Sequence, residues 1–175
     1  DGLARFIDNY SELDYLPQMF DTDSKENSFI SIDNEVVHES IPISLDGFKP
    51  IEYNKGDFEG MNERSYSHYS TMVAVFKQYI KLIEYLKAND VYDNTRIIIV
   101  SDHGTGIPCK QLVNNIPGLD KSQVTATLME KDFNSTGPVV FDNTFMCNAD
   151  TPYLATEGIV APEKQINPFT NKPLK

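Results

Sequence analysis

The chain lacks the signatures of several common protein classes. None of its apolar stretches comes near the roughly 20 residues that a membrane-spanning helix needs. It contains no G-x-G-x-x-G motif, no phosphate-binding P-loop and no G-x-S-x-G motif of a serine hydrolase. It also has no basic patch, since 26 acidic residues against 15 basic ones give a formal net charge of -11. Such a surface repels phosphate backbones, so we expect no nucleic-acid partner.

Cysteine is scarce as well, with only Cys109 and Cys147 in the chain. The two do not form a C-x-x-C pair, which argues against a zinc knuckle. In an oxidising compartment they could form one disulfide, and otherwise they are two unpaired thiols. The sequence leaves both alternatives open.

The composition, 40% hydrophobic and 23% charged in 175 residues, is typical of one globular domain. The strongest predicted helix covers residues 67–89, where apolar residues at three- and four-residue steps should form one buried face. These residues are Met72, Phe76, Tyr79, Ile83 and Leu86. A weaker helical pattern covers residues 3–16, where Pro17 limits its continuation. A short helix should begin at Thr151, which Pro152 follows.

Three segments are predicted as strands. Residues 28–32 alternate between polar and apolar types, and residues 124–129 are a plausible further strand. Residues 97–100 are four consecutive branched apolar residues, typical of a strand buried on both faces of a parallel sheet. Residues 40–64 hold several prolines and glycines without periodicity and should form a long irregular loop.

Asp102 and His103 directly follow the apolar strand, and Gly104 comes next. In open α/β sheets the carboxyl ends of the strands carry ligands and chemistry. A carboxylate and an imidazole side by side are suited to Zn²⁺, Mn²⁺ or a similar ion. Gly104 would let a ligand or a backbone segment approach closely. The structural alternative is that Asp102 caps a turn and His103 only packs.

His38 is the second candidate, in a polar stretch that follows the predicted strand at residues 28–32. It could bind an anionic substrate or transfer a proton, and the alternative is an exposed loop histidine. Glu35 and Glu39 flank it, and we expect both to be solvated carboxylates.

Three blocks of the chain resemble the sulfatase-like branch of the alkaline phosphatase superfamily. The specific block runs from Tyr92-Asp93-Asn94-Thr95 through the apolar strand to Ser101-Asp102-His103-Gly104. The other two are residues 29–39, which end in His38-Glu39, and residues 148–155. The chain is similar to the membrane-anchored members of this branch, the lipoteichoic acid synthases and the phosphoglycerol or phosphoethanolamine transferases. Asp90 or Val91 stands near the glycine that is usual in this family, which is a minor departure.

The resemblance implies an alkaline phosphatase-like α/β fold with three layers, α/β/α, and a mainly parallel or mixed sheet. Residues 1–175 would form a single partial domain, its carboxyl-terminal portion. Asp102 and His103 would ligate a divalent metal (Zn, Mn, Mg or Ca), and His38 would contact the anionic group of a phospho- or sulfo-ester substrate. The family's nucleophile and a further acidic ligand lie upstream, so we expect no catalytic nucleophile in this chain.

The resemblance further implies a metal-dependent transferase or hydrolase at the extracellular or periplasmic face of the membrane, anchored through an upstream segment. A phosphoglycerol or phosphoethanolamine transferase is the first choice, with the isolated chain inactive. The alternative enzyme is a sulfatase or phosphodiesterase. An alternative of another class is a non-catalytic binding domain, in which Asp102 and His103 are structural and the loop at residues 40–64 binds a partner.

Overall fold

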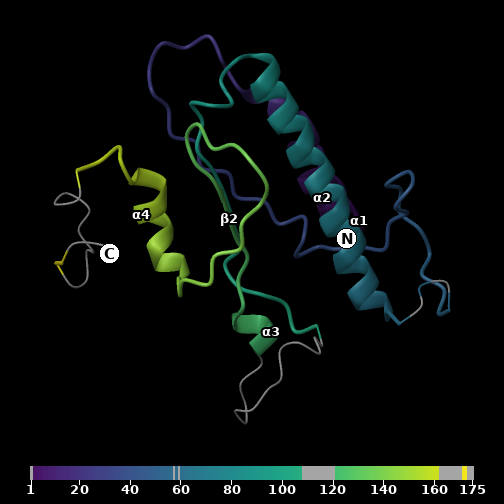
Figure 1. Ribbon diagram of the computed structural model, residues 1–175. Helices are drawn as coiled ribbons and strands as arrows, with labels where there is room; N and C mark the ends of the chain where they lie inside the picture. Colours follow the sequence, from purple (N-terminus) through teal and green to yellow (C-terminus); the bar gives the residue numbers. More distant parts are fainter. Residues whose placement is uncertain (1, 57, 59, 108–120, 162–170, 173–175) are drawn as a thin grey trace. The chain divides into compact units, whose positions relative to one another are not determined.

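The computed structural model describes residues 2–56, 58, 60–107, 121–161, 171 and 172. The chain divides into two compact units, residues 1–92 and residues 93–175. The elements are α1 (Gly2–Met19), α2 (Glu63–Ala88), β1 (Ile97–Val100), α3 (Lys121–Val124), β2 (Leu128–Lys131), the 3-10 helix η1 (Asn148–Asp150) and α4 (Thr151–Thr156), labelled in part in Figure 1. None of the helices within the described residues is long and apolar enough to cross a membrane.

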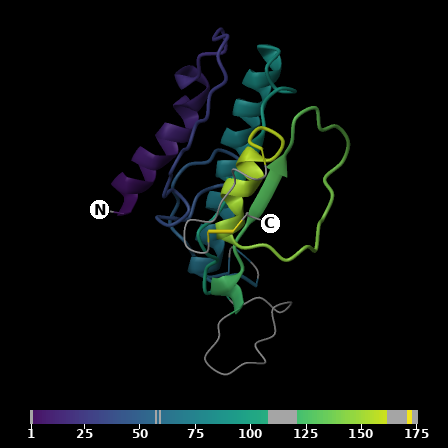
Figure 2. The same cartoon turned by 90° about the vertical axis from the view of Figure 1, so that its left-hand side faces the viewer.

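The first unit is built on α1 and α2, which lie side by side (Figure 2). Both predicted helices are present, although α1 continues through Pro17 to Met19. Asn62 caps α2, and its side-chain oxygen accepts a hydrogen bond from the Ser65 amide at 2.9 Å, as expected for a helix start. The core between the helices is apolar and also takes in two residues of the connecting segment. Its buried members are Phe6, Leu13, Leu16, Val36, Ile43, Ala74 and Val75.

A polar stripe on α2 holds the irregular segment in place. The Tyr66 hydroxyl donates to the Ile43 carbonyl at 2.8 Å, and the Thr71 hydroxyl donates to the Ile41 carbonyl at 3.3 Å. The Ile43 amide donates to the Ser70 hydroxyl at 3.3 Å. These bonds satisfy backbone groups that would otherwise be buried without partners.

This stripe explains why the predicted buried face of α2 is wrong. Of its five residues only Leu86 is fully buried, and the other four are half-buried. The helix turns Ser70, Thr71 and Gln78 inward instead, all at most 3% exposed. A hydroxyl that pairs with a neighbouring backbone is as well placed in the interior as an apolar side chain.

The predicted three-layer α/β/α fold with a mainly parallel or mixed sheet is wrong for the part of the chain that the structure describes. That part is mostly helical, and its single sheet has two antiparallel strands, β1 and β2. Residues 28–32 are not a strand, and Phe29 and Ile30 are 76% and 54% exposed. An alternating segment becomes a strand only where another strand offers it hydrogen-bond partners.

The two strands pair from Ile97 opposite Lys131 to Val100 opposite Leu128. The predicted strand at residues 124–129 is therefore shifted, since Val124 ends α3 and β2 begins at Leu128. β1 is half-buried rather than enclosed on both faces, and Val100 is 41% exposed. A short apolar run predicts a strand but does not distinguish parallel from antiparallel pairing.

Arg96 ties this hairpin to α4 within the second unit. Its side chain is only 8% exposed. Nε and Nη2 donate to Asp132 Oδ1 at 2.9 and 2.6 Å, and Nη1 donates to the carbonyls of Leu154 and Glu157 at 2.7 and 2.8 Å. The guanidinium also lies over the Phe133 ring, 4.7 Å from its centroid. The Arg96 guanidinium thus provides hydrogen-bond donors to carbonyl groups at the carboxyl end of α4, where positive charge is favourable.

Asp90 occupies the left-handed position that ends α2, with φ of 56°. The Asp90 amide donates to the Lys87 carbonyl at 3.2 Å, and the Val91 amide donates to the Leu86 carbonyl at 3.0 Å. This pair of bonds defines a Schellman motif, whose left-handed residue is usually glycine. Asp90 therefore occupies a position where the backbone favours glycine.

Asp90→Gly should stabilise the first unit by about 0.5–1 kcal/mol, because it relieves left-handed strain and removes an acid from a helix carboxyl end. Asp90→Ala removes the same charge but keeps a Cβ in the left-handed region, so its gain should be smaller or negative. Urea denaturation of the three proteins measures the difference. Equal stability of the Gly and Ala variants would contradict the conformational argument.

Arg96→Lys should weaken the second unit by about 2–4 kcal/mol, since an ammonium cannot reach Asp132 and two carbonyls together. Arg96 is also the first cause of the lowered pKa of Asp132. This pair therefore stabilises the fold above the ordinary carboxyl pKa and loses its effect as pH falls through the lowered one. Hydrogen exchange of the β1 and β2 amides measures the loss. Unchanged protection, or an unchanged Asp132 pKa by NMR titration, would overturn this role for Arg96.

Candidate functional site

The turn that carries Asp102 and His103 is fastened at both ends by backbone hydrogen bonds. The Ser101 amide donates to the Thr127 carbonyl at 3.0 Å, and the Thr127 amide donates to the Ser101 hydroxyl at 2.7 Å. The Gly104 amide donates to the Gln123 carbonyl at 2.8 Å. The turn therefore continues the β1–β2 pairing as far as the end of α3.

Gly104 is required here for close backbone packing. A Cβ at this position would lie 2.0 Å from the Ser122 carbonyl oxygen and 2.5 Å from that of Thr125. Both neighbours are backbone atoms, so neither can move aside as a flexible side chain would. The prediction that Gly104 permits a close approach is confirmed, and the approaching group is the backbone at the end of α3.

Asp102 and His103 lie at the end of β1, as predicted, although the sheet is antiparallel. Their side chains are 84% and 66% exposed. Asp102 Oδ1 accepts the His103 amide at 2.8 Å, and Asp102 Oδ2 lies 3.3 Å from His103 Nε2. His103 Nδ1 donates to the Gly104 carbonyl at 2.6 Å. A carbonyl oxygen can only accept, so Nδ1 carries a proton in this bond, and Nε2 is the ring nitrogen on the side of the carboxylate.

Asp102 Oδ2 and His103 Nε2 can share either a proton, as an ion pair, or a cation. A backbone carbonyl on the far nitrogen is also the usual second partner of a metal-binding histidine, because it fixes the ring and its tautomer. The hydrogen bond from the His103 amide to Asp102 Oδ1 is the turn cap of the structural alternative, while the His103 ring is exposed rather than packed.

Asn148 supports the same turn and was not singled out from the sequence. Its side-chain amide, at the start of η1, donates to the Asp102 carbonyl oxygen. The prediction that a short helix begins at Thr151 is confirmed, since α4 covers Thr151–Thr156. The only sequence signal for Asn148 is its place at the start of the third family-like block.

Further ligands are not gathered at this turn within the described ranges. No group of three or more histidine, cysteine, aspartate or glutamate side chains there is arranged to hold a metal ion. Cys147 is a free, exposed thiol, and Cys109 lies outside the described residues. The described residues therefore bring no further side chain of these types to the Asp102–His103 pair as a metal ligand.

His38 lies in a turn of the first unit, and its side chain is 76% exposed. Its Nδ1 is 3.7 Å from Glu39 Oε1, and the same oxygen accepts a 2.6 Å hydrogen bond from Arg5. The expectation that Glu39 is solvated is wrong, since its side chain is 14% exposed and ion-paired. His38 and the Asp102–His103 pair belong to different units.

His68 on α2 has a buried Nδ1 without a hydrogen-bond partner in the described part of the chain. Burial lowers the pKa of His68, and the charges of Arg64 and His38 lower it further. The lowered pKa favours the neutral form of His68, so this ring adds no positive charge to its surroundings.

No family model, no curated protein and no solved structure matches the chain.

Gly104→Ala should destabilise the second unit by about 1–3 kcal/mol, because the added methyl forces two backbone segments apart. Gly47→Ala is the matched control, since a Cβ there meets only ordinary contacts, at 3.6 Å from Ser44 Oγ. Hydrogen exchange of the Ser101, Gly104 and Thr127 amides measures the effect. Equal protection in wild type and Gly104→Ala would contradict the close approach.

Proposed function

We propose that the chain is part of a metal-dependent phospho- or sulfo-ester transferase or hydrolase, with a phosphoglycerol or phosphoethanolamine transferase as first choice. The observation that carries the proposal is the orientation of the Asp102–His103 pair. The family resemblance supports it and supplies the choice of substrate class. The parent protein would act at the extracellular or periplasmic face of the membrane.

The donor atoms fit a shared divalent ion. Two ligands of one tetrahedral zinc ion, each bond about 2.0–2.1 Å long, lie about 3.3–3.4 Å apart. Asp102 Oδ2 and His103 Nε2 are separated by 3.3 Å. Bound there, a divalent ion supplies Lewis-acid polarisation of an ester oxygen. The pair offers two of the usual four ligands, so the chain alone should bind the ion weakly.

His38 would bind the anionic group of the substrate, since its ring is exposed and the neighbouring Glu39 carboxylate is already paired with Arg5. The nucleophile would come from the rest of the parent protein. Because the nucleophile would lie outside this chain, we expect the isolated chain to be inactive.

Titration of the 175-residue chain with Zn²⁺ or Mn²⁺ by calorimetry tests the metal site. We expect one weak site, whose affinity falls at least tenfold in Asp102→Asn and in His103→Gln, because each removes one of two ligands. Both side chains are exposed, so neither change should unfold the protein. Asp142→Asn, which changes an exposed acid elsewhere in the same unit, is the charge-matched control.

Equal affinity for the ion in wild type and in both site variants would contradict the proposed metal site. The same preparation is then assayed with an aryl phosphate and an aryl sulfate, and we expect no metal-dependent turnover. Turnover by the isolated chain would contradict the proposal that its nucleophile lies elsewhere.

A further inference from the structure

The sequence contains the motif Asn-x-Ser/Thr twice, with Asn9 two residues before Ser11 and with Asn134 two residues before Thr136. In secreted proteins the asparagine of this motif is the acceptor of a covalently linked glycan where it lies on an accessible surface segment. The transferring enzyme must reach the asparagine amide and the hydroxyl two residues further on at the same time. The two copies of the motif differ in how they meet this requirement.

Asn134 lies in an exposed turn shortly after β2. Its backbone is in the left-handed region, with φ of 55°, and its backbone amide donates to the Asp93 carbonyl at 2.7 Å. The Ser135 amide closes the turn on the Asp132 carbonyl at 3.2 Å. These bonds hold only the backbone, and among the described residues the Asn134 side chain has no hydrogen-bond partner. Thr136 is exposed as well, so both groups of this motif are accessible to a modifying enzyme.

Asn9 is held in the packed part of the first unit. Its side-chain nitrogen donates to the Arg5 carbonyl at 2.9 Å, and its side-chain oxygen accepts a hydrogen bond from the Glu35 amide, also at 2.9 Å. The residue lies within α1, and side chains two positions apart on a helix do not face each other. Asn9 and Ser11 therefore cannot be presented together to one enzyme site while α1 is folded.

We propose that Asn134 is a glycosylation site and that Asn9 is not. The donor is a glycan attached to a polyprenyl diphosphate, and the enzyme is an oligosaccharyltransferase. Asn134 Nδ2 attacks the anomeric carbon of the first sugar and forms a nitrogen–carbon bond, while the bond from that carbon to the diphosphate oxygen breaks. The polyprenyl diphosphate leaves with the bonding electron pair, and the amide proton passes to a base of the transferase.

The proposed glycan and the Asp102 turn lie at opposite ends of the hairpin. Asn134 follows the end at which Lys131 pairs with Ile97, and Asp102 follows the other end. The four paired positions span about 10 Å of strand, so a glycan at Asn134 should leave the Asp102 turn accessible. The glycan rests on the proposed function only for its location outside the membrane. Metal titration and glycan analysis have separate readouts, so the failure of one proposal is distinguishable from the failure of the other.

The test uses the folded 175-residue chain, a purified oligosaccharyltransferase and a polyprenyl-diphosphate-linked glycan. We expect one glycan per chain, located at Asn134 by tandem mass spectrometry after enzymatic release has converted the modified asparagine to aspartate. Asn134→Gln should abolish the modification because it removes the acceptor, and Thr136→Ala should abolish it because it removes the hydroxyl. Ser135→Ala changes only the middle residue of the motif, and Asn9→Gln changes only the other motif. Both controls should leave the yield unchanged.

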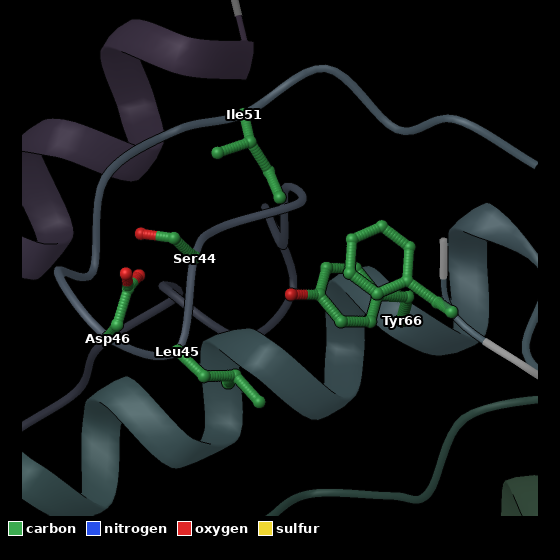
Figure 3. A pocket seen from close by; sticks show the side chains of 6 residues that line it. Ser44, Leu45, Asp46, Ile51 and Tyr66 are labelled. Carbon is green, nitrogen blue, oxygen red and sulfur yellow. The ribbon is translucent and has the colours of Figure 1, made fainter. Parts of the chain in front are cut away.

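Protection of Asn9 by the fold has a test of its own. Leu13→Asp places a charge at a core position of α1 that is 2% exposed, so it should unfold the first unit. The ring signals of Tyr66 report on that unit, because this ring is 4% exposed and lies beside the turn that carries Ser44 and Asp46 in Figure 3. Where those signals are lost, we expect a second glycan, on Asn9.

A folded chain that receives no glycan would overturn the proposal, provided that an unrelated acceptor peptide is modified in the same reaction. A glycan on Asn9 of the folded chain would overturn it as well, since the two motifs would then be equivalent. An unfolded Leu13→Asp chain that is still modified only at Asn134 would contradict the claim that α1 is what protects Asn9.

Discussion

The buried guanidinium of Arg96 is the contact on which the second unit depends. A two-stranded hairpin is at best marginally stable alone, and α4 has only six residues. Arg96 joins the two, because its planar fork reaches Asp132 beyond β2 and the carbonyls of Leu154 and Glu157 at once. Its hydrogen bonds also compensate for taking the charge out of water. The hairpin is thereby held in the pairing that ends at Val100, directly before the Asp102–His103 turn.

That turn is ordered by backbone more than by side chains. Thr127 extends the strand pairing to Ser101, and the Gln123 carbonyl accepts a hydrogen bond from the Gly104 amide. The missing Cβ of Gly104 allows this second contact. The same turn gives His103 a carbonyl partner on Nδ1, so that Nε2 faces Asp102 without any outside ligand. In the proposed metal site, this orientation would lower the entropy cost of binding an ion.

Local patterns in the sequence were sufficient for the helices and for the position of the turn. The long helix at residues 63–88 and the start of α4 at Thr151 follow from periodicity and capping chemistry, which operate within a few residues. The local patterns gave wrong predictions where contacts between residues far apart in the chain determine the structure. Ser70 and Thr71 are interior because they bond to residues near 42, and hydropathy alone places them outside. Residues 28–32 alternate as a strand does but find no strand to pair with, and the direction of β1 depends on a partner thirty residues away.

The same distinction applies to the candidate site. The sequence was sufficient to bring Asp102 and His103 together because both residues belong to one turn. The support of that turn was not visible, since Asn148 and the end of α3 reach it across long stretches of chain. Hydrogen-bonded neighbours of this kind set the orientation of ligands as firmly as the ligands' own rotamers do. Gly104 shows how far the sequence could predict this site. Its lack of a side chain predicted a close approach, but not whether a ligand or the protein's own backbone would occupy the space. In this unit the backbone does, so the open side of the site is the one bounded by the Asp102 carboxylate and the His103 ring.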